Sequence, residues 1–298
     1  MNKKTPRSKR ELLRSPNADK LKKDKRRKFG KRTIVFFICL ILLFIGSIFV
    51  SRIDKILINE INISGNQIID TKEVKDFVNL KLSGNYFFFF PKRNIFLYPK
   101  KTLEYDIEQR FKRILSMSLD LKDARVLYIN LTERSGSYLW CGEKPEAEDQ
   151  KTVGTCYFLD DEGYIFDNAP YFSGNVYFKF YGTPQSQKDT PLGGHFLDKD
   201  KFEKINEFKQ SILSLGLNPE YFYNNSLGDY EFVLQKKSSS GLAPQIIFKQ
   251  DADYEKLSGD LASALITEPL ATDIKTKYNM LQYIDLRFEN KAYYKFNK

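Results

Sequence analysis

Hydrophobic residues form one long unbroken run near the start of the chain. Residues 33–51 are nineteen residues without a charge, rich in Ile, Leu, Phe and Val, and a helix of that length reaches ~28 Å, enough to span a bilayer. The run is longer than the ~7 to 15 apolar residues of a secretory signal, and no A-x-A-like cleavage site precedes Arg52. We therefore predict a retained transmembrane helix at residues 33–51 rather than a cleaved signal peptide.

Beyond this run, apolar positions follow first a strand period and then a helical one. Leu57, Ile61 and Ile63 alternate and stop at the turn pair Gly65-Asn66, which predicts a strand. Two helices and two hairpin strands are predicted next by the following spacings: Val74, Phe77 and Val78; Leu103, Ile107 and Phe111; Met117, Leu119 and Leu121; Leu127, Ile129 and Leu131. The β-α-α-β-β order of residues 56–134 predicts a compact domain with helices on one face of a sheet.

Short aromatic strands separated by turn residues dominate residues 135–298. The candidates are residues 138–141, 156–159, 164–166, 176–181, 230–234, 245–249, 283–288 and 291–296. Helical spacing appears at residues 198–215, which Gly216 is placed to end, and at residues 254–265. The fold class is therefore α+β: a single N-terminal transmembrane helix, a β-α-α-β-β domain, and a mainly antiparallel β domain with flanking helices.

Basic residues are concentrated ahead of the apolar run. Residues 1–32 hold fifteen Lys or Arg against three acids, a net charge of +12, and because the whole chain carries +10 the remainder carries −2. The folded part is thus not basic, and we expect no nucleic-acid partner. The polar composition of residues 1–32 predicts a disordered tail. Such a tail attracts anionic lipid, which is the role we favour, or alternatively docks cytoplasmic partners or nucleic acid.

The same charge asymmetry predicts the topology. The excess of Lys and Arg upstream of residues 33–51 places the N-terminus in the cytoplasm. We therefore expect a single-pass plasma-membrane protein whose membrane contacts are residues 33–51 and the basic tail, with the C-terminal domains outside the cytoplasm.

The three cysteines fall into two groups. Cys39 lies in the apolar run, where it serves as a small apolar residue. Cys141 and Cys156 lie fifteen positions apart beside aromatic strand candidates, and outside the cytoplasm they can form a disulfide. Two unpaired buried thiols are the alternative; we favour the bridge, which stabilises by ~3 kcal/mol in the chain-entropy model.

Candidate catalytic groups are scarce. His195 is the only histidine. With Cys141 or Cys156 it could form a Cys-His pair, as in enzymes that cross-link cell walls, but no local signature surrounds either cysteine. No phosphate loop, dinucleotide fingerprint or zinc spacing is present. We expect no enzyme activity and no cofactor or metal.

Two charged clusters have structural explanations. Asp160, Asp161 and Glu162 precede Gly163, and although the cluster resembles a metal loop, further oxygen ligands at the ~12-residue calcium spacing are missing. A hairpin turn with Gly in the left-handed region explains the same residues. Asp285 and Arg287 stand two apart on a predicted strand and so share a face, which predicts a mutual salt bridge.

Four consecutive phenylalanines, residues 87–90, form the most unusual local sequence. They cannot all enter one core, because side chains alternate in direction along a strand and spiral along a helix. Two interpretations remain open: the rings pack beneath the connection at residues 91–98, or they contact a partner or the membrane surface.

Several motifs together resemble the FtsQ/DivIB family of bacterial division proteins. They are a basic tail before one membrane span and, in chain order, INISGN at residues 61–66, LTER at 131–134, YLW at 138–140, FLDDEGYIF at 158–166 and IDLRF at 284–288. The resemblance extends from the tail to Phe296. The phenylalanine insertion, the cysteine pair and the lack of a proline after Glu133-Arg134 depart from the family pattern.

The resemblance implies a non-catalytic scaffold of the divisome at the division septum. Residues 56–134 would be a POTRA domain, and residues 135–298 would bind small coiled-coil division proteins of the FtsB and FtsL type, beside other divisome components. In this family the partner adds a strand to the last edge strand, which maps here onto Lys291, Ala292, Tyr293, Tyr294, Lys295 and Phe296. An edge strand offers free N–H and C=O groups to an extended peptide.

Two other functions remain open. One is a membrane-anchored cell-wall enzyme that uses the Cys-His pair. The other is a POTRA-bearing component of envelope assembly or secretion, in which the C-terminal strand would be dispensable and the POTRA domain would not.

Overall fold

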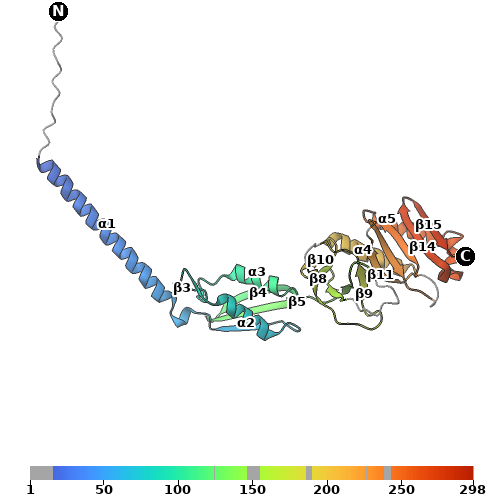
Figure 1. Ribbon diagram of the computed structural model, residues 1–298, viewed down its shortest axis with the longest axis horizontal. Coiled ribbons are helices and arrows are strands. Elements are labelled where there is room, and N and C mark those ends of the chain that lie inside the picture. The colour runs from blue at the N-terminus through green and yellow to red at the C-terminus, as the bar shows by residue number, and fades with distance from the viewer. Residues whose placement is uncertain are drawn as a thin grey trace, which may run out of the picture. The chain divides into compact units, whose positions relative to one another are not determined.

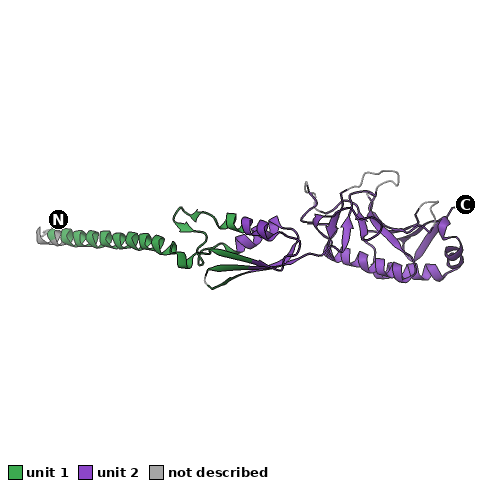
Figure 2. Cartoon of the chain, turned by 90° about the horizontal axis from the view of Figure 1, so that it is seen from below, with its two compact units in different colours: residues 1–62, 78–100, 120–128 green, residues 63–77, 101–119, 129–298 purple. Residues whose placement is uncertain are grey.

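The computed structural model describes residues 16–123, 125–145, 155–185, 190–225, 227–237 and 243–297. They form a mixed α+β fold with one long N-terminal helix, a three-stranded sheet and a mainly antiparallel ten-stranded sheet (Figure 1). The chain divides into two compact units (Figure 2): residues up to 62, 78–100 and 120–128 form the first, and residues 63–77, 101–119 and 129 onward form the second. This division runs through the three-stranded sheet, so the domain boundary at residue 134 stays a prediction.

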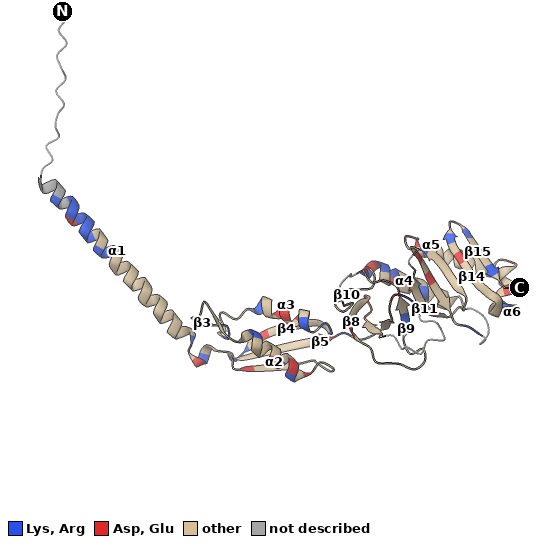
Figure 3. Cartoon of the chain, viewed as in Figure 1, with Lys and Arg blue, Asp and Glu red and all other residues tan. Residues whose placement is uncertain are grey.

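The N-terminal helix α1 spans Pro16–Ser51. It is long and apolar enough to cross a membrane, and its apolar window is not buried in the protein. The disorder predicted for residues 1–32 is wrong for residues 16–32, and residues 1–15 lie outside the described part. Lys and Arg have good helix propensity, and extending an existing apolar helix costs far less than nucleating a new one. The basic residues occupy the N-terminal part of α1 (Figure 3).

The strands and helices predicted between residues 56 and 134 are all present. After the short 3₁₀ helix Asp54–Ile56 they are β1 (Glu60–Ser64), α2 (Thr71–Leu82), α3 (Lys100–Arg110), β4 (Ile114–Lys122) and β5 (Val126–Glu133), and the sheet order is β1-β5-β4. Asp70 caps α2, since its Oδ1 accepts a hydrogen bond from Lys72 N at 2.9 Å. Val74 on α2 and Ile107 on α3 are fully buried, as their spacing predicted.

An additional hairpin, which was not predicted from the sequence, follows α2 and precedes α3 in the chain. Its strands are β2 (Asn85–Tyr86) and β3 (Phe90–Pro91). Phe87 and Phe88 form the turn with φ of 47° and 67°, a backbone region in which bulky residues are strained by about 1–3 kcal/mol each. Both side chains point outward, 84% and 89% exposed, so they do not pack beneath residues 91–98.

The ten-stranded sheet is built from residues 138–296. In spatial order its strands are β10 (Gly194–His195), β8 (Tyr164–Asn168), β7 (Tyr157–Leu159), β6 (Tyr138–Trp140), β9 (Phe178–Tyr181), β11 (Pro219–Asn224), β12 (Asp229–Leu234), β13 (Gln245–Lys249), β14 (Leu281–Phe288) and β15 (Lys291–Phe296). The pairs β6–β9, β9–β11 and β13–β14 are parallel and the other described pairs are antiparallel.

Helices contribute to the core of this sheet. α4 (Lys199–Ser214) buries Phe202, Ile205, Phe208 and Ile212, and α5 (Tyr254–Ile266) buries Leu257 and Leu261. These side chains join alternate strand residues such as Phe180 and Phe222 in one aromatic cluster. The intervening residues, among them Leu139 and Tyr181, form a smaller cluster with the partly buried Tyr221. The two clusters occupy opposite faces of the sheet because strand side chains alternate.

Candidate partner-binding edge strand

The predicted binding segment, residues 291–296, forms β15 with the same bounds. β15 is the last strand of the sheet order and has β14 as its only neighbour among the described strands. Its other edge therefore presents backbone N–H and C=O groups that no described strand pairs. The opposite end of the sheet is the two-residue strand β10, which offers a much shorter template.

The two faces of β15 differ. Ala292, Tyr294 and Phe296 are half-buried against the aromatic core. The intervening Lys291, Tyr293 and Lys295 are exposed, and the Tyr293 ring packs edge-on against Phe288 with centroids 5.1 Å apart. This alternation fixes the strand to the core through one face and leaves a tyrosine between two lysines on the other face.

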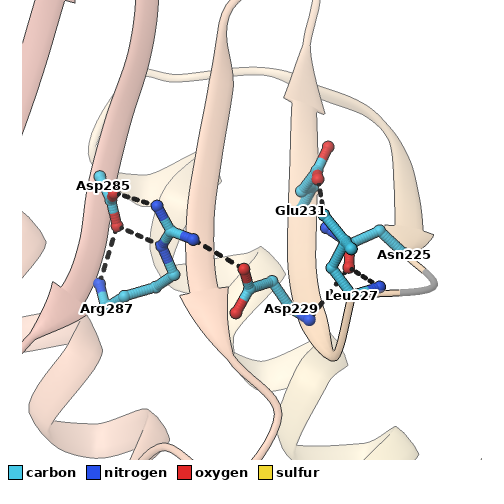
Figure 4. Close-up of polar contacts among 6 residues, drawn as sticks. All are labelled: Asn225, Leu227, Asp229, Glu231, Asp285 and Arg287. Carbon is cyan, nitrogen blue, oxygen red and sulfur yellow. Dashed lines mark hydrogen bonds and ion pairs between the residues drawn. The ribbon is translucent and has the colours of Figure 1, made fainter.

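The adjoining strand β14 carries a partly buried ion-pair network (Figure 4). Arg287 donates to Asp285 from Nη2 at 2.6 Å and from Nε at 2.9 Å. Its Nη1 donates to Asp229 Oδ2 at 2.7 Å, which lies on β12 beyond the intervening strand β13. The predicted pairing of Asp285 with Arg287 is confirmed, whereas the participation of Asp229 was not predicted.

The electrostatics of this network follow from its geometry. Burial alone raises the pKa of Asp285, but the hydrogen bonds and charge of Arg287 outweigh it, so the pKa lies below its ordinary value. The hydrogen bonds from Arg287 to Asp285 and Asp229 raise the pKa of the guanidinium. Asp285 pairs in register with Tyr293. The network therefore lies beside Tyr293 on the same face and ties the edge hairpin to the sheet interior.

A groove of about 280 Å³ borders β15 on the helical side. Its lining comes from α5, the connection between α5 and α6, the start of α6 (Leu270–Thr276), the β14–β15 turn and β15: Asp260, Ser263, Ala264, Thr267, Glu268, Leu270, Asn290, Lys291, Ala292 and Tyr294. It combines apolar surface with the two carboxylates of Asp260 and Glu268. This groove was not predicted from the sequence, because α6 is short and was itself not predicted.

The predicted disulfide is present between Cys141 and Cys156. Both sulfurs are bonded, so neither can act as a nucleophile while the bridge is intact. His195 lies on β10, where its ring packs against Tyr164 at 5.0 Å. The structure therefore does not assemble the Cys-His pair of the enzyme alternative.

The acidic segment 160–163 is a hairpin turn between β7 and β8. Gly163 has a φ of 76°, and Asp160 Oδ1 accepts hydrogen bonds from the N–H groups of Glu162 and Tyr164, each at 2.9 Å. Asp160 also pairs with Arg134. The described residues contain no cluster of three or more His, Cys, Asp or Glu that could hold a metal.

The motif Glu133-Arg134 has a structural explanation. Glu133 Oε1 accepts hydrogen bonds from the backbone N–H groups of Gln67, Ile68 and Ile69 at 2.7, 3.0 and 2.9 Å. The Arg134 guanidinium also lies 4.2 Å from the Tyr164 ring centroid. Glu133 thus holds the loop before α2, and Arg134 contacts the β7–β8 hairpin.

Neither a scan against models of known protein families nor a search of curated proteins finds a match to this chain.

Proposed function

We propose that this protein is a bitopic, non-catalytic scaffold of the bacterial divisome that binds an extended segment of a small coiled-coil division protein of the FtsB or FtsL type. The observation that carries the proposal is the free edge of β15, whose bounds coincide with the segment at which the FtsQ/DivIB resemblance puts partner binding. The partner adds an eleventh strand beside β15, and main-chain hydrogen bonds supply much of the affinity.

The membrane topology is part of the proposal. α1 crosses the plasma membrane at the septum, residues 16–32 continue the helix into the cytoplasm, and the chain from Arg52 onward lies outside. The basic residues at the N-terminal part of α1 (Figure 3) support this orientation. So does the Cys141–Cys156 bridge, because disulfides persist in oxidising compartments. In this arrangement the sheet β1-β5-β4 with α2 and α3 is a POTRA domain that assists recruitment.

The geometry indicates how the partner is held. Tyr293 is 50% exposed on the outer face and provides an aromatic anchor of the kind that dominates binding energy at interfaces. Arg287 joins β14 to β12 across β13, so the template strand is supported before binding and less ordering entropy is lost. The groove along α5 and α6 can receive side chains from the other face of the added strand.

The test is capture of small coiled-coil membrane proteins from native membranes by the detergent-solubilised full-length chain. Tyr293→Ala should weaken capture about tenfold, because truncating an aromatic anchor costs more than ~1 kcal/mol. Tyr171→Ala is the matched control, since Tyr171 is also exposed and lies on the same unit away from β15. A chain ending at Glu289 should capture nothing, with near-ultraviolet circular dichroism confirming that its sheet remains folded. Equal capture by all variants would refute the edge-strand site.

A further inference from the structure

The β2–β3 hairpin presents an apolar tip that packing inside the protein does not explain. Phe87 and Phe88 occupy the two central turn positions with positive φ, and Phe89 N donates to Tyr86 O at 3.0 Å across the turn. These are the features of a type I′ turn, for which Asn and Gly are the favoured residues. Two phenylalanines there are strained, and nearly all of their ring surface is exposed.

The hairpin lies against the last turns of α1. The rings of Phe89 and Phe90 pack edge-on against Phe44, with centroids 5.9 and 6.0 Å apart. Arg52 donates from Nη2 to Phe88 O at 3.3 Å and from Nε to Phe89 O at 3.2 Å. Phe44 precedes Arg52 by eight residues, which is ~12 Å along a helix axis. The hairpin therefore runs beside the apolar end of α1 instead of standing away from it.

We propose that the β2–β3 hairpin is a membrane-inserted element, with Phe87 and Phe88 in the acyl region of the leaflet that holds the C-terminal end of α1. This rests on the proposed function in one respect, namely that α1 crosses the bilayer. If Phe44 lies within the hydrocarbon, the rings in contact with it lie there too, because all these residues belong to one compact unit.

The backbone of the tip suits such a location. Backbone carbonyls next to hydrocarbon need partners within the protein, and the Arg52 guanidinium supplies them for Phe88 and Phe89. These carbonyls therefore lie at the depth of the Arg52 charge, and it is the rings that enter the acyl region. Lys92 N donates to Gly84 O at 3.1 Å and closes the hairpin base. The charged residues next to the tip, Arg52 and Lys92, thus lie where cations are found at a membrane interface.

Other apolar side chains surround the base of α1. The segment after the hairpin is held to the helix end, since Asn94 Nδ2 donates to Ser51 O at 2.9 Å. Phe96 on this segment and Ile53 after the helix are both exposed. These exposed apolar side chains near the end of a helix that is itself apolar and exposed are as expected for a lipid-covered surface.

The experiment places tryptophans one at a time in the full-length protein reconstituted in phosphatidylcholine vesicles, with bromine at a defined acyl depth as quencher. Trp140, the only native tryptophan, is a common background in all variants. Phe88→Trp reports on the tip of the hairpin, and Phe37→Trp reports on the apolar part of α1. Leu227→Trp is the control that should not be quenched, because Leu227 is exposed and belongs to the other unit. The added emission of Phe88→Trp should fall at least twofold in brominated vesicles and lie to the blue of Leu227→Trp.

Each other outcome overturns the inference in a distinguishable way. If Phe37→Trp is quenched and Phe88→Trp is not, α1 crosses the bilayer but the hairpin does not enter it, so the proposed topology holds and the inference fails. If neither variant is quenched, α1 does not cross the bilayer, and both the proposed topology and the inference fail. Phe88→Trp that is unquenched in lipid alone but shielded from aqueous acrylamide in native membranes would identify a protein as the occupant.

Discussion

The network around Arg287 makes a quantitative prediction about the stability of the ten-stranded sheet. Replacing Arg287 with Met keeps the apolar stem and leaves Asp285, which is 5% exposed, without a cation. Removing one member of a buried ion pair costs about 3–5 kcal/mol. The Arg287 side chain is 35% exposed, and solvent screening should reduce the loss in the free energy of unfolding to ~2–3 kcal/mol.

The assay is urea unfolding of the full-length protein in detergent micelles, followed by Trp140 fluorescence. Trp140 is buried on β6 of the same sheet and its Nε1 donates to Gly182 O at 2.9 Å, so its emission reports sheet packing. Arg110→Met is the matched control. Its ion pair with Glu73 is exposed, 60% and 53% for the two side chains, and should contribute less than ~1 kcal/mol.

The pH dependence tests the electrostatic reasoning. The pKa of Asp285 is held below its ordinary value, so its ion pair stabilises the folded state above the unfolded pKa near 4 and is lost as pH falls below it. Without Arg287, burial raises the pKa of Asp285 and protonation relieves the penalty. The difference in unfolding free energy between wild type and Arg287→Met should be largest near neutral pH. It should begin to narrow above pH ~4, where Asp285 of the variant takes up its proton, and narrow further below pH ~4 as the wild-type carboxylate is protonated.

Two results would refute this reasoning. One is a loss in the free energy of unfolding for Arg287→Met that is no larger than the loss for Arg110→Met. The other is a difference in this free energy between wild type and Arg287→Met that does not change with pH. The double variant Asp285→Asn/Arg287→Met should recover part of the lost stability, because the uncompensated carboxylate is gone.

Two further predictions use the same unfolding assay. Glu133→Ala should lower the free energy of unfolding by ~1–3 kcal/mol, because three backbone N–H groups lose a charged acceptor. Glu133→Gln, which keeps a neutral acceptor, should lower it less. Burial lowers the pKa of Lys209 to about 8. Lys209→Met should therefore raise the free energy of unfolding by ~1–3 kcal/mol at pH 7. The increase should shrink as pH rises from 8 towards the pKa of Lys209 in the unfolded state, and an increase that is the same at every pH would refute the burial argument.

Elements with a strong period were predictable from the sequence. α4 follows from the stripe Phe202, Ile205, Phe208 and Ile212 and from Gly216, which has a φ of 82°. β15 follows from alternation after the two-residue turn at Glu289-Asn290, where Asn290 takes a φ of 57°. In both cases residues close in sequence carry the signal, so no knowledge of distant partners is needed.

Elements that depend on distant partners were missed. β11 begins at Pro219 and ends at Asn224, two residues typical of loops, yet it pairs with β9 on one side and β12 on the other. Pairing with two neighbouring strands overrides these local loop signals. Asp229 joins Arg287 for the same reason: the two residues are 58 positions apart in the chain, and only the strand order brings them together.

The composition of β15 indicates what kind of strand can bind there. In antiparallel self-pairing centred on Tyr293, Lys291 of one chain opposes Lys295 of the other, and like charges directly opposed destabilise a strand pair. Register shifts in the β14–β15 pairing also twist the edge, which discourages flat edge-to-edge association. A strand with Asp or Glu opposite the two lysines avoids this charge repulsion. Basic residues on its other face would meet Asp260 and Glu268 in the groove. We therefore expect the bound segment to alternate acidic and basic positions, so that charge selects the partner while the backbone provides the pairing.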